Sequence, residues 1–364
     1  MINKMKILIL PGDGVGPEVT NEAVKVIHVI SDIYSLKIEL EYGVFGGAAV
    51  DKYSDPFPNE TKEKISNCDA VLLGAVGGPQ YDSLQKNKKP ESGLLSLRKQ
   101  LNLFINIRPI ISFGELINSS TIKSEYINNL DIVIIRELIS GLYFGEPRGF
   151  NNDRSEAFNT MRYSESEVIR ICDYAFKLSQ TRTKKLCSVD KANVLEVSQL
   201  WRASVNKLSK KFSDVKLNHM YVDNAAMQLV QNPKQFDVIV TENLFGDILS
   251  DLASVLTGSI GMLPSASLNE DNFGVYEPIH GSAPDIVNKN IVNPIATILS
   301  VAMLFQHTFN RLDIYDHILN SVKLVLKDGK LTKDLSGDNK YVSTSDMGNL
   351  IIEKLKDKSS AKKI

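Results

Sequence analysis

Short apolar runs alternate with longer segments of helical periodicity along most of the chain, and this alternation limits the fold more than any other feature. The runs have the length and the β-branched content of buried strands. Segments 17–31, 164–179 and 193–212 repeat apolar residues every three to four positions, as helices do. Because strands that are separated by helices usually pair in parallel, the pattern predicts an α/β fold with a largely parallel sheet. The predicted strands are 6–10, 37–42, 70–73, 106–110, 131–136, 186–189, 218–222 and 237–241.

The composition argues against several classes of protein. The chain has 364 residues, of which 43% are hydrophobic and 23% charged, and its formal net charge is −1. This length is typical of two domains, and the near-neutral charge gives no general attraction to nucleic acid or to an anionic membrane. The first apolar run is far shorter than the roughly 18 residues that a membrane span needs. We therefore expect a cytoplasmic protein, in which the basic tail at 356–364 is solvated.

The cysteines and histidines argue against a metal site built from soft ligands. Cys68, Cys172 and Cys187 are widely spaced and form no C-x-x-C motif, and the five histidines are dispersed. Neither a disulfide framework nor a thiolate zinc site is expected from this distribution.

The segment GDGVGP at residues 12–17 follows the first predicted strand and opens a helix, which is where a dinucleotide fingerprint would lie. That fingerprint, G-x-G-x-x-G, needs a third glycine where this chain has Pro17. Two interpretations remain, a Rossmann site or a tight strand-to-helix turn beside a ligand, and the second is favoured. If the chain binds NAD, another loop should hold it.

An amphipathic helix is predicted over residues 243–257, and it carries Asp247 and Asp251 on one face. Like charges four residues apart destabilise an isolated helix by roughly 0.2–0.5 kcal/mol, and this helix has no Lys or Arg to offset them. The face is either solvated or neutralised by a divalent cation such as Mg²⁺, which prefers carboxylate oxygens. Asp223, placed at the end of another predicted strand, would supply a third carboxylate.

Five further residues are candidates for binding or proton transfer. Arg98, Arg108 and Arg136 lie on or beside apolar segments. Each alone is more often part of a structural ion pair, but three together indicate a site for a dicarboxylate, since the guanidinium fork matches a carboxylate. Tyr143 and Lys191 are proton-transfer candidates, because a Lys beside other cations or in a buried site can act as a base. Without further context, residues of this kind are more often ordinary surface residues.

Several motifs occur together in a fixed order: ESGLLSLR at 91–98, REL at 136–138 with YFG at 143–145, DKANVL at 190–195, NLFGDILSD at 243–251 and HGSAPD at 280–285. In that order they closely resemble the isocitrate/isopropylmalate dehydrogenases, which are β-decarboxylating enzymes, over residues 7 to about 352. The resemblance implies a two-domain α/β fold with a non-Rossmann cofactor site. One domain, 1–103 and 258–364, would hold both termini and bind the cofactor. The other, 104–257, would hold the substrate, the metal and the dimer interface, with 151–163 in an intersubunit arm.

The resemblance also implies a role for each candidate residue in an NAD-dependent homodimer whose active sites are shared between subunits. Tyr143 would be the proton donor, and Lys191 of the partner subunit would accept the proton of the substrate hydroxyl. The ligands of Mg²⁺ or Mn²⁺ would be Asp247 and Asp251, completed by Asp223 of the partner subunit. The substrate residues would be Arg98, Arg108, Arg136, Asp223, Glu91, Leu94 and Leu95. The NAD residues would be Gly78, Glu91, His280, Gly281, Ser282, Ala283, Pro284, Asp285 and Asn293.

Residues near the motif at 91–98 narrow the expected substrate. Leu94 and Leu95 would form an apolar wall with Glu91 beside it. A third substrate carboxylate about 5 Å from Glu91 would cost on the order of 3 kcal/mol at an effective dielectric of about 20. Plain malate would lose apolar contacts worth roughly 1–3 kcal/mol per methylene. We therefore expect oxidative decarboxylation of (2R,3S)-3-isopropylmalate, as in leucine biosynthesis, and NAD in place of NADP because Asp285 would repel a 2′-phosphate.

Three alternatives stay open from the sequence. A related enzyme that acts on malate, tartrate or homoisocitrate would share most of these motifs. A catalytically silent regulatory subunit would be expected to lack Lys191, Tyr143 or an acidic ligand, and this chain has all of them. A metal-dependent hydrolase would have no need of the loop at 280–285.

Overall fold

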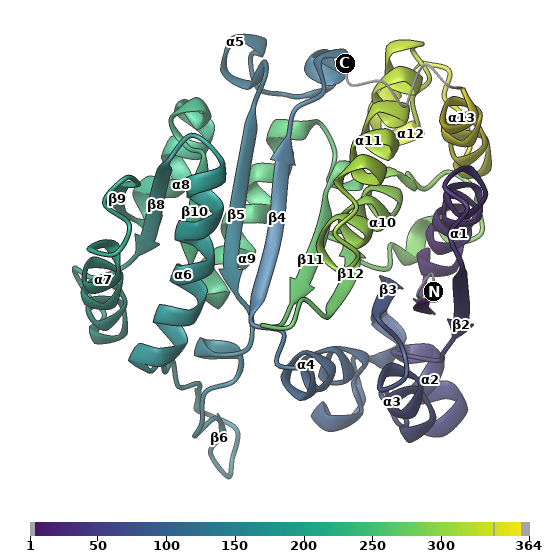
Figure 1. The fold of residues 1–364 in the computed structure, drawn as a ribbon. Helices are drawn as coiled ribbons and strands as arrows, with labels where there is room; N and C mark the ends of the chain where they lie inside the picture. Colours follow the sequence, from purple (N-terminus) through teal and green to yellow (C-terminus); the bar gives the residue numbers. More distant parts are fainter. Residues whose placement is uncertain (1–3, 338, 358–364) are drawn as a thin grey trace.

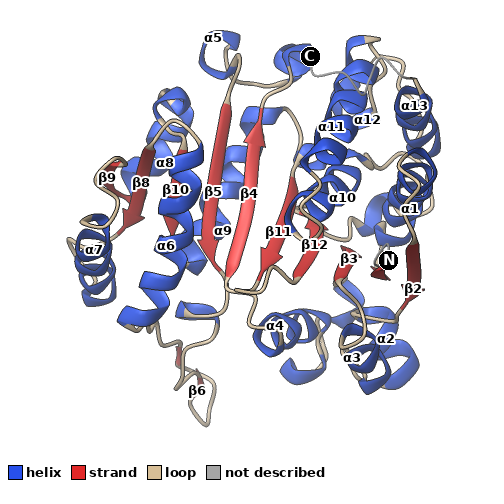
Figure 2. Cartoon of the chain, viewed as in Figure 1, coloured by secondary structure: helices blue, strands red, loops and turns tan. Residues whose placement is uncertain are grey.

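One twisted, ten-stranded mixed sheet runs through the protein and carries helices on both faces (Figure 1; Figure 2). The computed structural model describes residues 4–337 and 339–357, so most of the predicted tail at 356–364 lies outside the described residues. The strand order is β2-β1-β3-β12-β11-β4-β5-β10-β8-β9. The predicted α/β fold with a mixed, largely parallel sheet is confirmed. The strands are β1 Met5–Gly12, β2 Ile38–Tyr42, β3 Ala70–Ala75, β4 Ile105–Ile111, β5 Asp131–Glu137, β8 Lys185–Asp190, β9 Lys216–Tyr221, β10 Val238–Thr241, β11 Pro264–Leu268 and β12 Gly274–Pro278.

All eight predicted strands are present, but the sequence analysis missed β11 and β12 in the middle of the sheet. These two strands pair antiparallel with each other, and they join β4 to β3. The segment of β11 is PSASL, which begins with Pro and consists mostly of small residues. It is buried along its whole length, so it shows neither a long apolar run nor a polar–apolar alternation. The antiparallel pairing of β4 with β5 completes the mixed part of the sheet.

The two faces of the central strands bury different sets of helices. Ile107 and Ile135 lie in the core cluster that includes residues of α6, α10 and α11, whereas Ile110 and Ile134 lie in a separate cluster with residues of α8 and α9. In Figure 1, α6, α10 and α11 lie in front of the sheet and α9 lies behind it. The longer helices are α1 Gly16–Ile33, α4 Pro90–Gln100, α6 Glu165–Thr181, α7 Glu196–Ser209, α8 Val222–Gln231, α9 Asn243–Ser254, α10 Ile295–His307, α11 Leu312–Lys327 and α13 Thr344–Lys356. The shorter ones are α2 Gly47–Tyr53, α3 Asn59–Ile65, α5 Ser124–Ile127 and α12 Lys333–Ser336.

The ten-stranded sheet contains strands from both predicted domains and is continuous between them. The division of the chain at 103/104 and 257/258 stays a prediction. A small hairpin of β6 Gly149–Phe150 and β7 Ala157–Phe158 projects away from the sheet, within and beside the segment expected to form an arm (Figure 1). The aromatic side chains of Phe150 and Phe158 are exposed on it. None of the described helices is both long and apolar enough to cross a membrane.

Candidate active site

Helix α9 lies close to β4 and β5 because the residues that face the sheet are small. Gly246 and Ser250 are buried there, and a Cβ on Gly246 would lie 2.6 Å from Cγ of Arg136. The predicted apolar stripe of this helix is therefore only partly correct. The amphipathic pattern puts Ile248 and Val255 on the buried face, but they are 55% and 43% exposed, because the helix turns its small residues and Leu249 toward the sheet.

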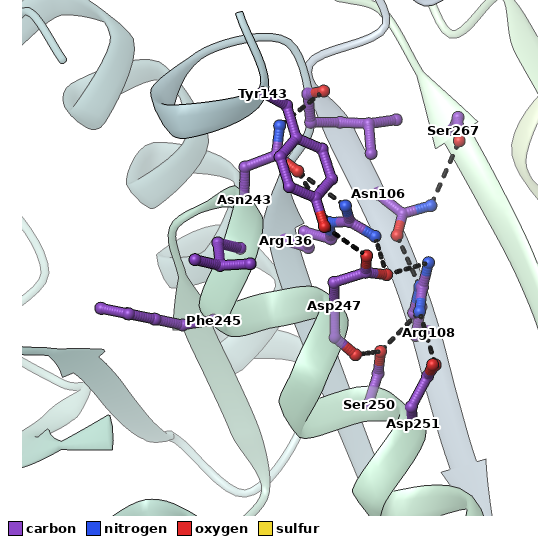
Figure 3. Close-up of polar contacts among 12 residues, drawn as sticks. Asn106, Arg108, Arg136, Tyr143, Asn243, Phe245, Asp247, Ser250, Asp251 and Ser267 are labelled. Atoms are coloured by element: carbon purple, nitrogen blue, oxygen red, sulfur yellow. Dashed lines mark hydrogen bonds and ion pairs between the residues drawn. The ribbon is translucent and has the colours of Figure 1, made fainter. Parts of the chain in front are cut away.

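Arg108 on β4 and Arg136 on β5 both point toward α9 and reach the two aspartates (Figure 3). Nη1 of Arg136 lies 2.5 Å from Oδ1 of Asp247, and Nη2 of Arg108 lies 3.4 Å from the same oxygen. Nη1 of Arg108 is also 3.4 Å from Oδ1 of Asp251. The inference that the aspartate pair lacks a compensating charge is therefore wrong, since the sheet supplies the cations that the helix does not.

Neutral side chains fix the plane of each guanidinium. Nε and Nη2 of Arg136 donate to Oδ1 of Asn243 at 3.1 and 2.7 Å. Arg108 donates from Nε to Asn106 at 2.8 Å and from Nη1 to Ser250 at 2.6 Å. The sequence analysis missed these three partners. Asn243 and Ser250 belong to the motif at 243–251, but nothing in their spacing distinguishes them from ordinary helix residues.

The electrostatics of this cluster keep both partners charged. Burial lowers the pKa of Arg136 to about 10 and also lowers the pKa of Arg108, which leaves both cationic at neutral pH. Burial alone would raise the pKa of Asp247, but Arg136 and Arg108 outweigh it and hold that pKa below its usual range. For Asp251 burial prevails and raises the pKa, although Arg108 opposes it.

Tyr143 joins the same cluster from the 3-10 turn Gly141–Tyr143 that follows β5. Its hydroxyl donates to Oδ2 of Asp247 at 2.8 Å, and the guanidinium of Arg136 lies 5.5 Å from the centre of its ring. Burial and the hydrogen bond to Asp247 raise the pKa of Tyr143 to about 12, so the phenol keeps its proton at neutral pH. The structure therefore brings the predicted proton donor to the arginines and the aspartates.

Arg98 reaches this region from α4. Its charge contributes to lowering the pKa of Arg108, Arg136 and Asp247, which indicates that the three guanidiniums are close together. Nη2 of Arg98 donates to Glu277 at 2.9 Å, and its buried Nε has no partner among the described residues. A buried guanidinium with an unused donor is suited to receive an anion.

Lys191 and Asp223 form a separate pair. Nζ of Lys191, just after β8, lies 2.7 Å from Oδ1 of Asp223 and lowers the pKa of that carboxyl. The prediction that Asp223 lies at the end of a strand is wrong, because the residue lies in the first turn of α8. Within the described part of a single chain, no three Asp, Glu, His or Cys side chains are grouped as a metal site, so Asp223 is not brought to Asp247 and Asp251.

Helix α4 carries the predicted specificity residues together with Arg98. Leu94 and Leu95 are both half-buried one turn before Arg98, and Leu94 packs against a core cluster. Glu91 lies in the first turn of the same helix, and its Oε1 lies 2.5 Å from the position that a Cβ on Gly77 would take. The carboxylate therefore lies against the loop that contains Gly78.

The glycine-rich turn at 12–17 packs directly against the loop at 280–285. The amide of Val15 donates to the carbonyl of Ser282 at 2.9 Å, and a Cβ on Gly14 would lie 2.0 Å from that carbonyl oxygen. Gly14 also has a φ of 57°. The glycine is needed because another backbone fills the space beside it, which supports a tight packing turn over a Rossmann site.

A buried carboxylate ties the second predicted cofactor segment to this turn. Asp13 accepts hydrogen bonds from the amides of Gly47, Ala48 and Gly77 at 2.7–2.8 Å. The loop that contains Gly77 and Gly78 is thereby fixed beside the turn at 12–17. Asp13 could not be singled out from the sequence, because a carboxylate between glycines also occurs in loops that bind nothing.

The loop at 280–285 has the features of a ligand site. Nδ1 of His280 lies 2.9 Å from the carbonyl of Gly281, and its buried Nε2 has no partner among the described residues. Burial lowers the pKa of His280, so the ring is neutral. Gly281, Pro284 and Asp285 are exposed, Ala283 is half-buried, and Ser282 is buried against the turn. Asn293 is also buried, and its amide bonds Asp334 and the start of α10, so it does not face an open site.

Comparisons with known proteins agree with this arrangement. Residues 6–351 match the family model described as isocitrate/isopropylmalate dehydrogenase. The chain is 54% identical over 355 residues to a 3-isopropylmalate dehydrogenase of Pseudomonas syringae and 55% identical over 354 residues to one of Xanthomonas oryzae; each alignment covers 96% of this chain and 99% of the relative. Among solved structures, an isocitrate dehydrogenase of Methylococcus capsulatus aligns with a TM-score of 0.86 at 33% identity, covering 97% of this chain and 100% of the other. A β-decarboxylating dehydrogenase of Thermococcus kodakarensis aligns with a TM-score of 0.79 at 34% identity, covering 97% and 96%.

Proposed function

The chain belongs to the isocitrate/isopropylmalate dehydrogenase family, and from this premise we propose that it oxidises and decarboxylates (2R,3S)-3-isopropylmalate. The products are 2-oxo-4-methylpentanoate and CO₂, and NAD⁺ is the oxidant, as in leucine biosynthesis. One observation supports this function most strongly. Arg98, Arg108, Arg136, Tyr143 and Asp247 meet at one place between α4, α9 and the sheet.

The three arginines bind the two carboxylates of the substrate. Arg136 and Arg108 are almost fully buried and are held in fixed planes, so little side-chain entropy is lost when an anion arrives. Tyr143, with a pKa of about 12, keeps a proton that it can donate to the carbon left by decarboxylation. Lys191 of the partner subunit accepts the proton of the substrate hydroxyl.

The site also fits a divalent cation and NAD. Asp247 and Asp251 offer carboxylate oxygens of the kind that Mg²⁺ and Mn²⁺ prefer, and their side chains are 33% and 58% exposed. A cation held there would supply Lewis-acid chemistry, lowering the pKa of the substrate hydroxyl and stabilising the negative charge left by loss of CO₂. NAD would be the hydride acceptor, and the free Nε2 of His280 with the open loop around Gly281 supports binding of its adenosine.

We further propose that the active form is a homodimer with shared sites. Exposed apolar side chains lie on α8, on α9 and on the loop before α7, with Met227, Ile248 and Val194 each more than half exposed. Asp223 lies on α8, next to α9, so an isologous contact between these helices would bring Asp223 of the partner subunit near Asp251. A monomer would then lack part of the metal site.

An assay of NADH production tests the function. The purified protein is given 3-isopropylmalate, isocitrate or malate, each with Mg²⁺, with Mn²⁺ or with EDTA. We expect turnover of 3-isopropylmalate above the other two, because Leu94 and Leu95 favour an apolar group and Glu91 repels a third carboxylate. A preference for isocitrate would refute the substrate assignment, and full activity in EDTA would refute the metal assignment.

A further inference from the structure

Glu137 is a fully buried carboxylate next to the proposed site, and the chemistry above makes no use of it. It follows Arg136 on β5, so the two side chains point to opposite faces of the sheet. Arg136 faces α9, whereas Glu137 faces α6 and lies 3.3 Å from Nη2 of Arg170. Arg170 is the only cation within ion-pair distance of Glu137 in the part of the chain that the structure describes.

The carboxylate of Glu137 holds the backbone that leads to Tyr143. Oε2 accepts a hydrogen bond from the amide of Ser140 at 2.9 Å, and Oε1 accepts a longer one from the amide of Ile139 at 3.4 Å. These two residues connect β5 to the 3-10 turn that carries Tyr143. The direction of the Tyr143 side chain therefore depends on the backbone bend at residues 139–140, which the carboxylate of Glu137 fixes.

A second path runs from Glu137 to Arg136. The hydroxyl of Tyr163 donates to Oε2 of Glu137 at 3.2 Å and accepts from the backbone amide of Asn243 at 3.0 Å. The side chain of Asn243 in turn donates to the carbonyl of Ser140 at 3.1 Å and accepts hydrogen bonds from Nε and Nη2 of Arg136. Glu137 thus supports the start of α9 and the residue that orients the guanidinium.

We propose that Glu137 is a positioning residue whose ionised carboxylate holds Tyr143 and Arg136 in their reactive geometry. This inference rests on the function proposed above. When Glu137 takes up a proton, one of its oxygens becomes a donor and can no longer accept freely where the amide of Ser140 and the hydroxyl of Tyr163 converge. The turn then loosens and turnover falls.

Burial places this protonation near neutral pH. It raises the pKa of Glu137 to about 7, although Arg170, the two backbone amides and Tyr163 oppose it. Two other acidic groups face the same region: Glu167 of α6 accepts from Oγ of Ser140, and Glu242 caps the start of α9. Removing the charge of Arg170 should therefore raise the pKa of Glu137 further.

The test compares kcat and KM from pH 5.5 to 9 in the full-length enzyme. The wild type should lose kcat as the pH falls through about 7. Glu137→Gln should lower kcat about 10- to 100-fold, the scale expected when a reacting group is misplaced by about 1 Å. The same variant should no longer show the loss of kcat at acidic pH, which is the acidic limb of the profile. Its KM for NAD should change less than about twofold. Arg170→Met should move the limb to higher pH. Asp237→Asn, which removes another buried carboxylate paired with an arginine at the far end of the sheet, should keep the wild-type limb.

Hydrogen exchange supplies a measurement that does not depend on activity. After correction for intrinsic rates, the amides of residues 139–143 should be better protected at pH 8 than at pH 6 in the wild type. In Glu137→Gln this difference should vanish. The inference would be overturned if Glu137→Gln and Arg170→Met both kept the acidic limb of the wild-type kcat profile. It would also be overturned if the protection of amides 139–143 in the wild type did not vary with pH. A protein that fails to oxidise 3-isopropylmalate but shows the exchange change would refute the proposed function alone.

Discussion

Replacing Asp247 with Asn tests whether the arginines depend on this carboxylate when no substrate is present. Arg136 and Arg108 are 1% and 6% exposed, and the variant leaves them without their shared counter-charge. Removal of one partner from a buried ion pair costs about 3–5 kcal/mol. Because the side chain of Asp247 is one-third exposed and Asp251 still faces Arg108, we expect the lower end of that range, a loss of about 3 kcal/mol in the free energy of unfolding.

Urea unfolding followed by the fluorescence of Trp201, the single and buried tryptophan, measures this loss. A small dianion such as malonate should bind the guanidiniums that have lost Asp247 and restore stability, by about 2.7 kcal/mol at a hundredfold excess over its Kd. The matched control is Asp313→Asn, which removes an exposed pair with Arg311 and should cost less than about 1 kcal/mol. Sodium chloride at equal ionic strength separates binding from screening.

Two results would refute the reasoning. The first is an unfolding midpoint of Asp247→Asn that equals that of the wild type, which would mean that the arginines are stable without the carboxylate. The second is a gain from malonate that is as large in Asp313→Asn as in Asp247→Asn, which would mean that the anion acts away from these arginines.

Four further outcomes are expected. Asp251→Asn should raise the Mg²⁺ concentration for half-maximal activity by more than about tenfold, with little change in the urea midpoint because this side chain is 58% exposed; equal losses of both would favour a merely solvated face. Leu95→Ala should lower kcat/KM for 3-isopropylmalate at least about tenfold and leave that for malate within a few-fold. Asp285→Lys should shift the ratio of kcat/KM for NAD and NADP roughly 30-fold toward NADP, since reversing one charge near a phosphate is worth about 2 kcal/mol in water. Because the pKa of Glu137 is raised to about 7 in the folded state, the native protein binds a proton that the unfolded chain releases between about pH 5 and 7. As the pH rises from 5 to 8, the unfolding free energy of the wild type should therefore fall by about 2–3 kcal/mol relative to that of Glu137→Gln. A difference between the two proteins that does not change with pH would contradict this assignment.

Strands could be predicted from the sequence where their buried positions carry apolar side chains. The central parallel strands are continuous runs of Val, Ile and Leu, and they stand out for that reason. β11 could not be found in this way, because its Ser265 and Ser267 are buried through pairing with two neighbouring strands and not through hydrophobicity. Its position depends on contacts between segments that are more than 150 residues apart.

The candidate site shows the same limit more clearly. Arg108, Arg136, Asp247 and Tyr143 were each identified from the sequence, but the ion pairs among them join β4 and β5 to a helix more than 100 residues later in the chain. Periodicity reports only neighbours on the same element, so the helix alone predicted an uncompensated acidic pair. Glu137 lies in the motif at 136–138, but the sequence predicts no role for it. Its proposed role depends on hydrogen bonds that connect it through Ser140 and Tyr163 to Asn243, and these residues come from separate segments of the chain.

The pairing of arginines with aspartates suggests how a site can bind two charged partners without a large electrostatic penalty. Before binding, the guanidiniums of Arg108 and Arg136 are balanced by Asp247 and Asp251, and Arg98 by Glu277. A substrate dianion adds two negative charges, and a divalent cation adds two positive ones. If the cation takes the aspartates while the substrate carboxylates take the arginines, every buried charge keeps a partner throughout. Either one alone would break buried ion pairs, which is costly, so the geometry favours binding of substrate and metal together over binding of either alone.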